Sequence, residues 1–166
     1  MGARPTLSTT VVVATYNRPQ ELRRLVEGLA LQDDPDFDLI IVDDGSDEPP
    51  NLDGVTSDLE LQIVRQPNGG PSSARHAGVS RASGELIIVL DDDMIVEPGF
   101  VAAHRRRHEA GCDVAIGRYT VVGEGTDLLS FQMNTIAAYL DACEADDATL
   151  LPGRLSTGNV SFRRSL

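Results

Sequence analysis

Four short apolar segments, separated by segments with helical periodicity, constrain the fold of this chain more than any other feature. The pattern predicts buried strands at residues 10–15, 38–42, 61–65 and 85–90, of which the last is the most apolar. Strands that alternate with helices form a mostly parallel sheet with helices on both faces. The sequence therefore predicts an α/β fold.

The predicted helices differ in how they begin and in the face that they bury. Asn17 is a candidate N-cap of the first helix, and Pro19 fits its first turn. Small residues that allow close packing on a sheet lie on one face of a second helix at 72–82, namely Ala74, Ala77 and Gly78. The remaining elements are predicted as a helix at 98–109, a strand at 114–119, a helix at 128–143 and a strand at 157–162.

The charged residues exclude several classes of protein. Of 166 residues, 26 are acidic and 14 are basic, which leaves a formal net charge of −12. A chain this acidic repels the phosphate backbone, so we expect no nucleic-acid partner. Every basic residue is arginine, and the absence of lysine excludes P-loop and Schiff-base sites. A bound phosphate then requires arginine, backbone N–H groups or a metal.

Length and apolar content predict one domain without a transmembrane segment. The longest apolar runs, such as residues 86–90, are far too short to span a bilayer, and no secretory signal opens the chain. The two cysteines, Cys112 and Cys143, match no metal-ligand spacing and favour a reducing compartment. We therefore expect a cytoplasmic protein.

A polar cluster follows each of the four predicted strands. Ligands of open α/β sheets bind beyond the carboxyl ends of the strands, where such clusters meet. Tyr16 is a candidate stacking platform, and Arg75 is a candidate phosphate ligand in the first turn of its helix. Asp43 and Asp44 are candidate acceptors for a ligand N–H or hydroxyl, although Asp-Gly-Ser is also ordinary turn chemistry. The clusters comprise residues 15–18, 43–46, 69–75 and 91–93.

Three consecutive aspartates, Asp91, Asp92 and Asp93, follow the most apolar strand. Adjacent carboxylates repel one another, so this arrangement requires a positive partner. Hard oxygen ligands suit Mg²⁺ or Mn²⁺, which take one or two carboxylates and complete their shell with substrate phosphates. The alternative is a solvated acidic turn.

The histidines match no zinc motif. His104 and His108 are four residues apart in the predicted helix at 98–109, but three arginines, Arg105, Arg106 and Arg107, lie between them. This run predicts a solvated basic helix face rather than a metal site or a nucleic-acid patch.

The order of these motifs resembles the family 2 glycosyltransferases of GT-A fold. The similarity runs from about residue 9 to 120, and residues 157–164 resemble a later strand of the family. It implies a Rossmann-like, mostly parallel sheet flanked by helices on both faces. The motifs are Thr-Tyr-Asn-Arg at 15–18, Asp-Asp-Gly-Ser at 43–46, Gly-Gly-Pro through Ala-Arg to Gly at 69–78, and Asp-Asp-Asp at 91–93.

The resemblance also implies roles for individual residues. Tyr16 would lie against the nucleotide base, Asp44 would accept a hydrogen bond from it, and Arg75 would lie near the base or the phosphates. Asp93 would bind an Mn²⁺ or Mg²⁺ cofactor that bridges the diphosphate, with Asp91 facing the ribose or the metal shell. The donor is a nucleotide-diphosphate sugar, with a UDP-sugar favoured. The full set of implied donor-binding residues is Thr15, Tyr16, Arg18, Asp43, Asp44, Arg75, Asp91 and Asp92.

The family pattern divides the chain into a flexible tail at 1–8, a nucleotide-binding core at 9–120 and the start of an acceptor-side region at 121–166. Family members invert the anomeric centre by direct displacement, with a carboxylate as general base. Their base motif would lie beyond Leu166, so we expect a single GT-A donor-binding domain that is truncated on its C-terminal side. Such a fragment need not transfer sugar by itself, and its acceptor stays unassigned.

Truncation would expose part of the sheet or a helix-packing face, which favours a homo-oligomer. Two other functions stay open. The first is a non-catalytic nucleotide-sugar-binding module. The second is a haloacid-dehalogenase-type phosphatase, whose Asp-x-Asp strand end resembles residues 91–93, although that enzyme needs a lysine and carries the motif after its first strand.

Overall fold

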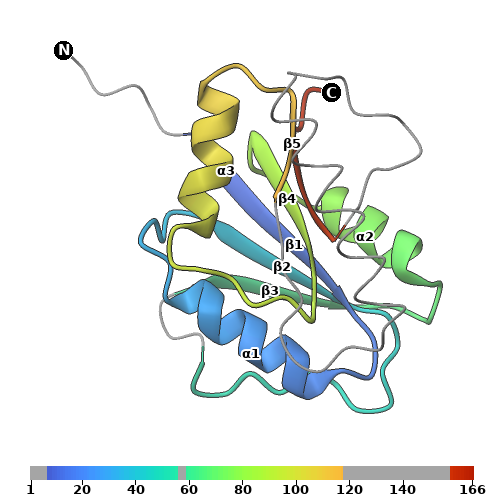
Figure 1. Cartoon of the computed structure of the whole chain (residues 1–166). Helices are drawn as coiled ribbons and strands as arrows, with labels where there is room; N and C mark the ends of the chain where they lie inside the picture. The colour runs from blue at the N-terminus through green and yellow to red at the C-terminus, as the bar shows by residue number, and fades with distance from the viewer. Residues whose placement is uncertain (1–6, 56–58, 118–157) are drawn as a thin grey trace, which may run out of the picture. The chain divides into compact units, whose positions relative to one another are not determined.

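The computed structural model describes residues 7–55, 59–117 and 158–166. The chain divides into two compact units, residues 1–115 with 157–166 and residues 116–156. The first unit contains nearly all the described elements (Figure 1). They are β1 (Thr9–Thr15), α1 (Pro19–Ala30), β2 (Asp38–Asp43), β3 (Glu60–Arg65), α2 (Pro71–Val79), β4 (Leu86–Asp91), α3 (Phe100–Glu109), β5 (Val114–Ile116) and β6 (Asn159–Arg163).

The predicted α/β architecture is confirmed. The described strands form one sheet in the order β3-β2-β1-β4-β6-β5. β1 pairs in parallel with β2 and β4, and β2 pairs in parallel with β3. β6 runs antiparallel to β4, so the sheet is mostly parallel. The predicted helix at 128–143 lies outside the described residues.

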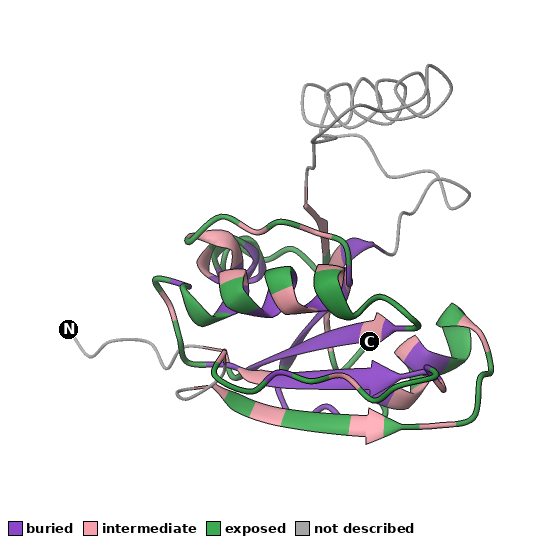
Figure 2. Cartoon of the chain, turned by 90° about the horizontal axis from the view of Figure 1, so that it is seen from below, coloured by how far each residue is buried: buried purple, intermediate pink, exposed green. Residues whose placement is uncertain are grey.

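Each face of the sheet has its own apolar core. Alternate residues of β1, such as Val11 and Val13, pack with α1, while Val12 packs with α2 on the opposite face. Figure 2 shows the buried central strands between the more exposed helices. β3 is different, because it is an edge strand whose residues are mostly exposed, and Ile63 is one of them. Helices therefore cover both faces, as the alternating pattern predicts.

The small face of α2 packs closely on the sheet, as the sequence predicts. Ala74 and Gly78 are buried. A Cβ atom added at Gly78 would lie 2.4 Å from Cγ1 of Val12 and 3.2 Å from Cγ2 of Val42. The helix ends at Val79 instead of Ala82. The backbone N–H groups of residues 80–82 still donate hydrogen bonds to carbonyls of residues 76–79, and they form a tight turn after the helix.

Asn17 does not cap α1, so that prediction was wrong. Arg18 occupies the N-cap position without a side-chain cap, and Pro19 lies in the first turn as predicted. Asn17 instead takes a left-handed conformation with φ of 53°. Its N–H donates to Ser46 Oγ over 2.9 Å, and its side chain exchanges two hydrogen bonds with Asp47. Asn17 therefore ties the loop after β1 to the loop after β2.

The prediction of a solvated basic face on α3 was also wrong for three of its five residues. His104, Arg105 and His108 are buried, whereas Arg106 and Arg107 are exposed. Arg105 pairs with Asp34 and donates to Thr9 Oγ1 and to the carbonyl of Asp36. The cause of the burial is that β1, β6 and the loop after α1 supply partners for these polar groups.

The two buried histidines of α3 share one hydroxyl group of β6. His104 Nδ1 lies 2.7 Å from Ser161 Oγ, and His108 Nε2 lies 2.8 Å from the same atom. His104 Nε2 lies 2.9 Å from Asn159 Oδ1. With that oxygen as acceptor, His104 donates from Nε2, Ser161 donates to His104 Nδ1, and His108 donates to Ser161. This one-way chain of hydrogen bonds is complete with both rings neutral.

Burial lowers the pKa of His104 and of His108 below the ordinary histidine value. The hydrogen bond to Asn159 and the charge of Asp113 act in the opposite direction, while Arg163 adds to the lowering at His108. His108 Nδ1 is buried and has no hydrogen-bond partner among the residues that the structure describes. Both histidines therefore stay neutral in the native protein at a pH where the unfolded chain is protonated.

This difference predicts a loss of stability in mild acid. As the pH falls from about 6.5 to 5, the unfolded chain binds protons that the native chain does not, so the free energy of unfolding falls by up to about 1.4 kcal/mol per pH unit for each histidine. Urea unfolding across this range measures the slope. His108→Gln keeps an N–H near the Nε2 position and removes one titrating group, so we expect about half the slope. His76→Gln, at an exposed position, is the matched control, and an unchanged slope in His108→Gln would contradict the assignment.

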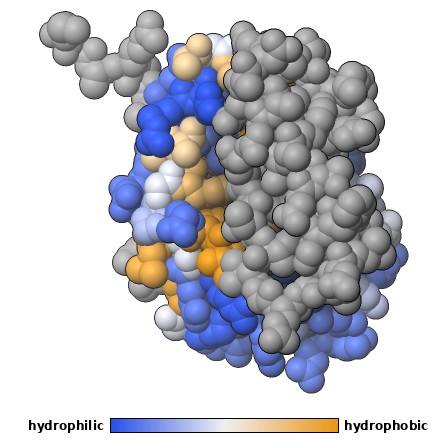
Figure 3. Space-filling model, in the orientation of Figure 1, coloured by the Kyte–Doolittle hydropathy of each residue, from blue (hydrophilic) through white to orange (hydrophobic). Residues whose placement is uncertain are grey.

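Hydrophobic residues also reach the surface on the face that carries α1 and α3, where Figure 3 shows them among hydrophilic neighbours. In the described part of the chain, the large apolar side chains that are exposed are Tyr16, Leu31, Ile63, Ile95, Val114 and Leu166. Self-association through such residues stays a prediction.

Candidate functional site

The carboxyl ends of β1, β2 and β4 bring three of the predicted clusters to one edge of the sheet. The register places Thr15 beside Asp43 and Ala14 beside Asp91. Hydrogen bonds join the clusters directly, and two of them start or end at Thr15. The N–H of Asp44 donates to the carbonyl of Thr15 over 2.9 Å, and Thr15 Oγ1 donates to Asp92 Oδ2 over 2.7 Å. The predicted residues therefore form one connected site.

The three consecutive aspartates have three different surroundings. Asp92 is buried and accepts hydrogen bonds from Thr15 and from Arg18. Asp93 is half exposed and lies 2.9 Å from Nη1 of Arg18. Asp91 is partly buried and pairs with Arg75. Burial raises the pKa of Asp92, while the Thr15 hydroxyl and the charge of Arg18 act against it.

Arginine supplies the positive charge that the sequence pattern requires at this strand end. Arg18 and Arg75 between them contact all three carboxylates. Among the described residues, no group of three or more His, Cys, Asp and Glu side chains is arranged to hold a metal. Asp91 and Asp93 are nevertheless hard oxygen donors with partly exposed side chains. This donor set fits a divalent cation that also takes oxygens from a bound diphosphate.

Asp44 shapes the glycine-rich turn before α2. Its carboxylate accepts hydrogen bonds from Gln66 Nε2 and from the backbone N–H groups of Gly69 and Gly70, at 2.7, 3.0 and 2.8 Å. Burial acts to raise the pKa of Asp44, but these three donors outweigh it, so the pKa is lowered. Gly70 has φ of +86°, which permits the turn into the helix. Asp44 thus positions the loop, and sequence reasoning missed Gln66.

Two buried polar atoms near this edge have no hydrogen-bond partner in the part of the chain that the structure describes. They are Asp43 Oδ2 and Arg75 Nε. Asp43 Oδ1 accepts from the N–H of Ser46, while Oδ2 has Arg65 Nε 3.5 Å away. Unpartnered buried polar atoms are rare and need a reason. Asp43 Oδ2 is thus ion-paired with Arg65, and Arg75 Nε is a buried donor that suits a polar ligand at this edge.

Arg65 is a site residue that sequence reasoning missed. It stands opposite Asp43 in the β2–β3 register and also donates to the carbonyl of Ser46. Its position as the last residue of the third predicted strand was the available signal, because the carboxyl ends of parallel strands share one edge. Tyr16, by contrast, lies at this edge as predicted, with 47% of its surface exposed.

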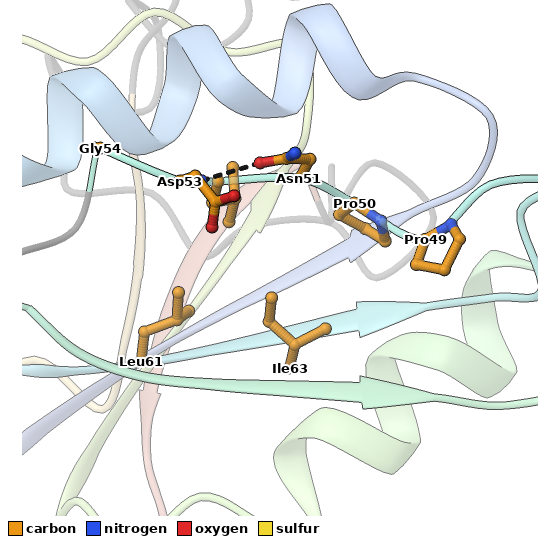
Figure 4. A pocket seen from close by; sticks show the side chains of 8 residues that line it. Pro49, Pro50, Asn51, Asp53, Gly54, Leu61 and Ile63 are labelled. Carbon is orange, nitrogen blue, oxygen red and sulfur yellow. Dashed lines mark hydrogen bonds between the residues drawn. The ribbon is translucent and has the colours of Figure 1, made fainter.

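A separate hollow of about 600 Å³ lies beside the edge strand β3 (Figure 4). The loop at residues 49–54 forms one wall, and Leu61 and Ile63 of β3 form the other. None of the residues predicted to bind a donor lines this hollow.

Comparison with known sequences identifies the family. The sequence model of "Glycosyl transferase family 2" matches residues 10–164, nearly the whole chain. The chain belongs to glycosyl transferase family 2. This membership decides against the phosphatase that the Asp-x-Asp pattern left open, and it confirms the resemblance of the motifs.

Similar proteins are themselves glycosyltransferases. This family 2 chain is 33% identical over 132 residues to succinoglycan biosynthesis protein ExoO of Rhizobium meliloti, covering 77% of the chain and 38% of ExoO. It is 31% identical over 96 residues to the uncharacterised glycosyltransferase YwdF of Bacillus subtilis, covering 57% of the chain and 36% of YwdF. The chain thus spans less than two-fifths of the length of these relatives.

Solved structures share the GT-A fold. Residues 1–349 of TarS from S. aureus in complex with UDP-GlcNAc are 28% identical to this chain, with a TM-score of 0.64 over 72% of the chain and 37% of that structure. The mannosyltransferase PcManGT of Pyrobaculum calidifontis, solved with GDP-Man and Mn²⁺, has a TM-score of 0.64 over 96% of the chain and 45% of that structure. At 19% identity it supports the fold alone. Within the described residues of this family 2 chain, no helix is long and apolar enough to cross a membrane.

Proposed function

We propose that this chain forms the donor-binding part of a metal-dependent, inverting glycosyltransferase that uses a nucleotide-diphosphate sugar, with a UDP-sugar favoured. The observation that carries the proposal is the meeting of the aspartates with Arg18 and Arg75 at the carboxyl edge, where Arg75 Nε is buried without a hydrogen-bond partner among the described residues. The UDP-GlcNAc complex of TarS supports the choice of donor class.

Different site residues would contact different parts of the proposed donor. Tyr16 offers an exposed ring on which the base stacks. Asp43, whose Oδ2 pairs with Arg65, and Asp44, which holds the glycine turn, place carboxylate oxygens where they would accept a base N–H group. Arg75 offers Nε to the ribose or the phosphates.

Asp93 and Asp91 would hold the proposed cation, Mn²⁺ or Mg²⁺. When bound, it stabilises negative charge on the leaving nucleoside diphosphate. Asp92 is buried against Thr15, so we assign it to holding the strand end and the loop after β1 together. Arg75 pairs with Asp91, and we infer that its guanidinium group would also serve the phosphates of a bound donor.

Calorimetric titration with UDP tests this function. We expect binding in the presence of Mn²⁺ and little binding in its absence. Asp93→Ala removes a proposed cation ligand, so metal-dependent UDP affinity should fall at least about tenfold. Glu109→Ala removes an exposed carboxylate at the end of α3 and is the matched control.

Two results would contradict parts of the proposal. Equal UDP affinity of wild type and Asp93→Ala would remove Asp93 from the cation site. Binding of GDP or dTDP in place of UDP would keep the donor class and change the base. A folded chain that binds none of the three nucleotides would exclude the proposed function.

A further inference from the structure

Arg18 occupies a position that the proposed cation also needs. Its Nη1 atom lies 3.2 Å from Asp92 Oδ1 and 2.9 Å from Asp93 Oδ2. The Asp93 side chain is 52% exposed, and Arg18 is its ion-pair partner in the described part of the chain. A guanidinium group and a divalent cation repel each other when both approach one carboxylate. Arg18 therefore places its positive charge where the proposed cation would bind Asp93.

The two carboxylates that Arg18 contacts differ in how firmly the surrounding protein holds them. Asp92 has a side chain only 8% exposed and is held by the Thr15 hydroxyl, so its carboxylate is fixed. The backbone of Arg18 is held as well, because its carbonyl accepts from the N–H of Leu22 in the first turn of α1. Within the described residues, no hydroxyl group holds the Asp93 carboxylate in the way that Thr15 holds Asp92. Arg18 can therefore leave Asp93 while it remains on Asp92.

We propose that Arg18 couples the binding of cation and nucleotide, because it competes with the cation for Asp93 and, once displaced, pairs with the donor diphosphate. This inference rests on the function proposed above. Without nucleotide, the cation must displace Arg18 and leave a guanidinium group beside it. With nucleotide, the diphosphate supplies an anionic partner for Arg18. Each ligand then strengthens the other, and by linkage the strengthening is equal in both directions.

Arg18→Gln tests the coupling, because it gives two effects of opposite sign. Without nucleotide, the variant should bind Mn²⁺ roughly three- to tenfold more tightly than wild type, since the competing charge is gone. With saturating Mn²⁺, it should bind UDP roughly three- to tenfold more weakly. Mn²⁺ affinity is read from the electron paramagnetic resonance signal of the free ion, and UDP affinity from calorimetry. A merely structural defect would weaken both.

Two further variants control the experiment. Arg23→Gln removes the same charge from an exposed position on α1, where Arg23 pairs with Glu27, and should leave both affinities unchanged. Arg18→Lys keeps the charge beside Asp93, so its affinity for Mn²⁺ alone should stay closer to wild type than that of Arg18→Gln. The urea midpoint of each variant is compared with wild type to confirm folding.

The outcomes separate the two proposals. If wild type shows Mn²⁺-dependent UDP binding and Arg18→Gln leaves the affinity for Mn²⁺ alone unchanged or weaker, the coupling role of Arg18 is overturned and the proposed function stands. If wild type binds Mn²⁺ and UDP independently of each other, the coupling is overturned at once. If wild type binds no nucleotide, the proposed function fails and the coupling fails with it.

Discussion

Replacing Arg105 by alanine is expected to lower the free energy of unfolding by about 3–5 kcal/mol, as is usual when one partner of a buried ion pair is removed. The Arg105 side chain is 4% exposed and joins α3 to two other segments. It pairs with Asp34, donates to Asp36 O over 2.7 Å, and contacts Thr9 Oγ1 through Nε and Nη2. Its loss leaves a carboxylate and a carbonyl without their donors and opens a cavity.

Chemical denaturation measures this effect, and the neighbouring arginine provides the control. Arg106→Ala removes the same type of side chain from an exposed position on α3 and should change stability by less than about 0.5 kcal/mol. In a double variant, Asp34→Asn should recover part of the loss in an Arg105→Met background, because it removes the unpaired charge. Equal losses in Arg105→Ala and Arg106→Ala would show that the buried pair contributes nothing.

Gly78→Ala is expected to destabilise the chain by about 2 kcal/mol, although alanine favours helices over glycine by up to about 1 kcal/mol. The new Cβ would lie 2.4 Å from Cγ1 of Val12, which is fully buried in the centre of the sheet. Val12 cannot withdraw, because its register partners Ile40 and Val89 pack beside it in the same core. The helix α2 must therefore move outward.

Gly99→Ala is the matched control for Gly78→Ala. An added Cβ at Gly99 meets no atom within 4 Å, and its φ of −88° is accessible to alanine. The difference between the two urea midpoints isolates the steric contact from the effect of the added methyl group on the unfolded chain. A stabilised Gly78→Ala would mean that α2 does not pack as closely on β1 as described.

The parallel core could be predicted from the sequence because its evidence is local. The apolar runs of β1, β2 and β4 can be recognised from the sequence of each segment alone. The same is true of the small residues around Gly78. The burial of Arg105 and of the two histidines could not be predicted in this way. It depends on Asp34, 71 residues away from Arg105, and on Ser161, which lies 57 and 53 residues away from the two histidines in the sequence.

The candidate site was predictable as a location but less so in its internal contacts. Strand ends place the aspartates and arginines at one edge, but no local pattern shows that Asp92 points inward to Thr15 while Asp93 points to solvent. From the sequence we predicted that a metal ion neutralises the carboxylates. Arg18 and Arg75 perform that task, because the start of α1 and the helix α2 bring them within ion-pair distance of the aspartates.

The antiparallel strand β6 has a consequence for how the chain folds during synthesis. β4 acquires its parallel neighbour β1 early, but its other edge stays open until residues 159–163 leave the ribosome. At usual translation speeds that interval lasts roughly 3–14 seconds. During it, an apolar strand presents unpaired backbone groups, and His104 and His108 lack their hydroxyl partner. Within the described sheet, β6 thus covers an apolar strand edge only late in synthesis, and until then this edge is open to wrong pairing.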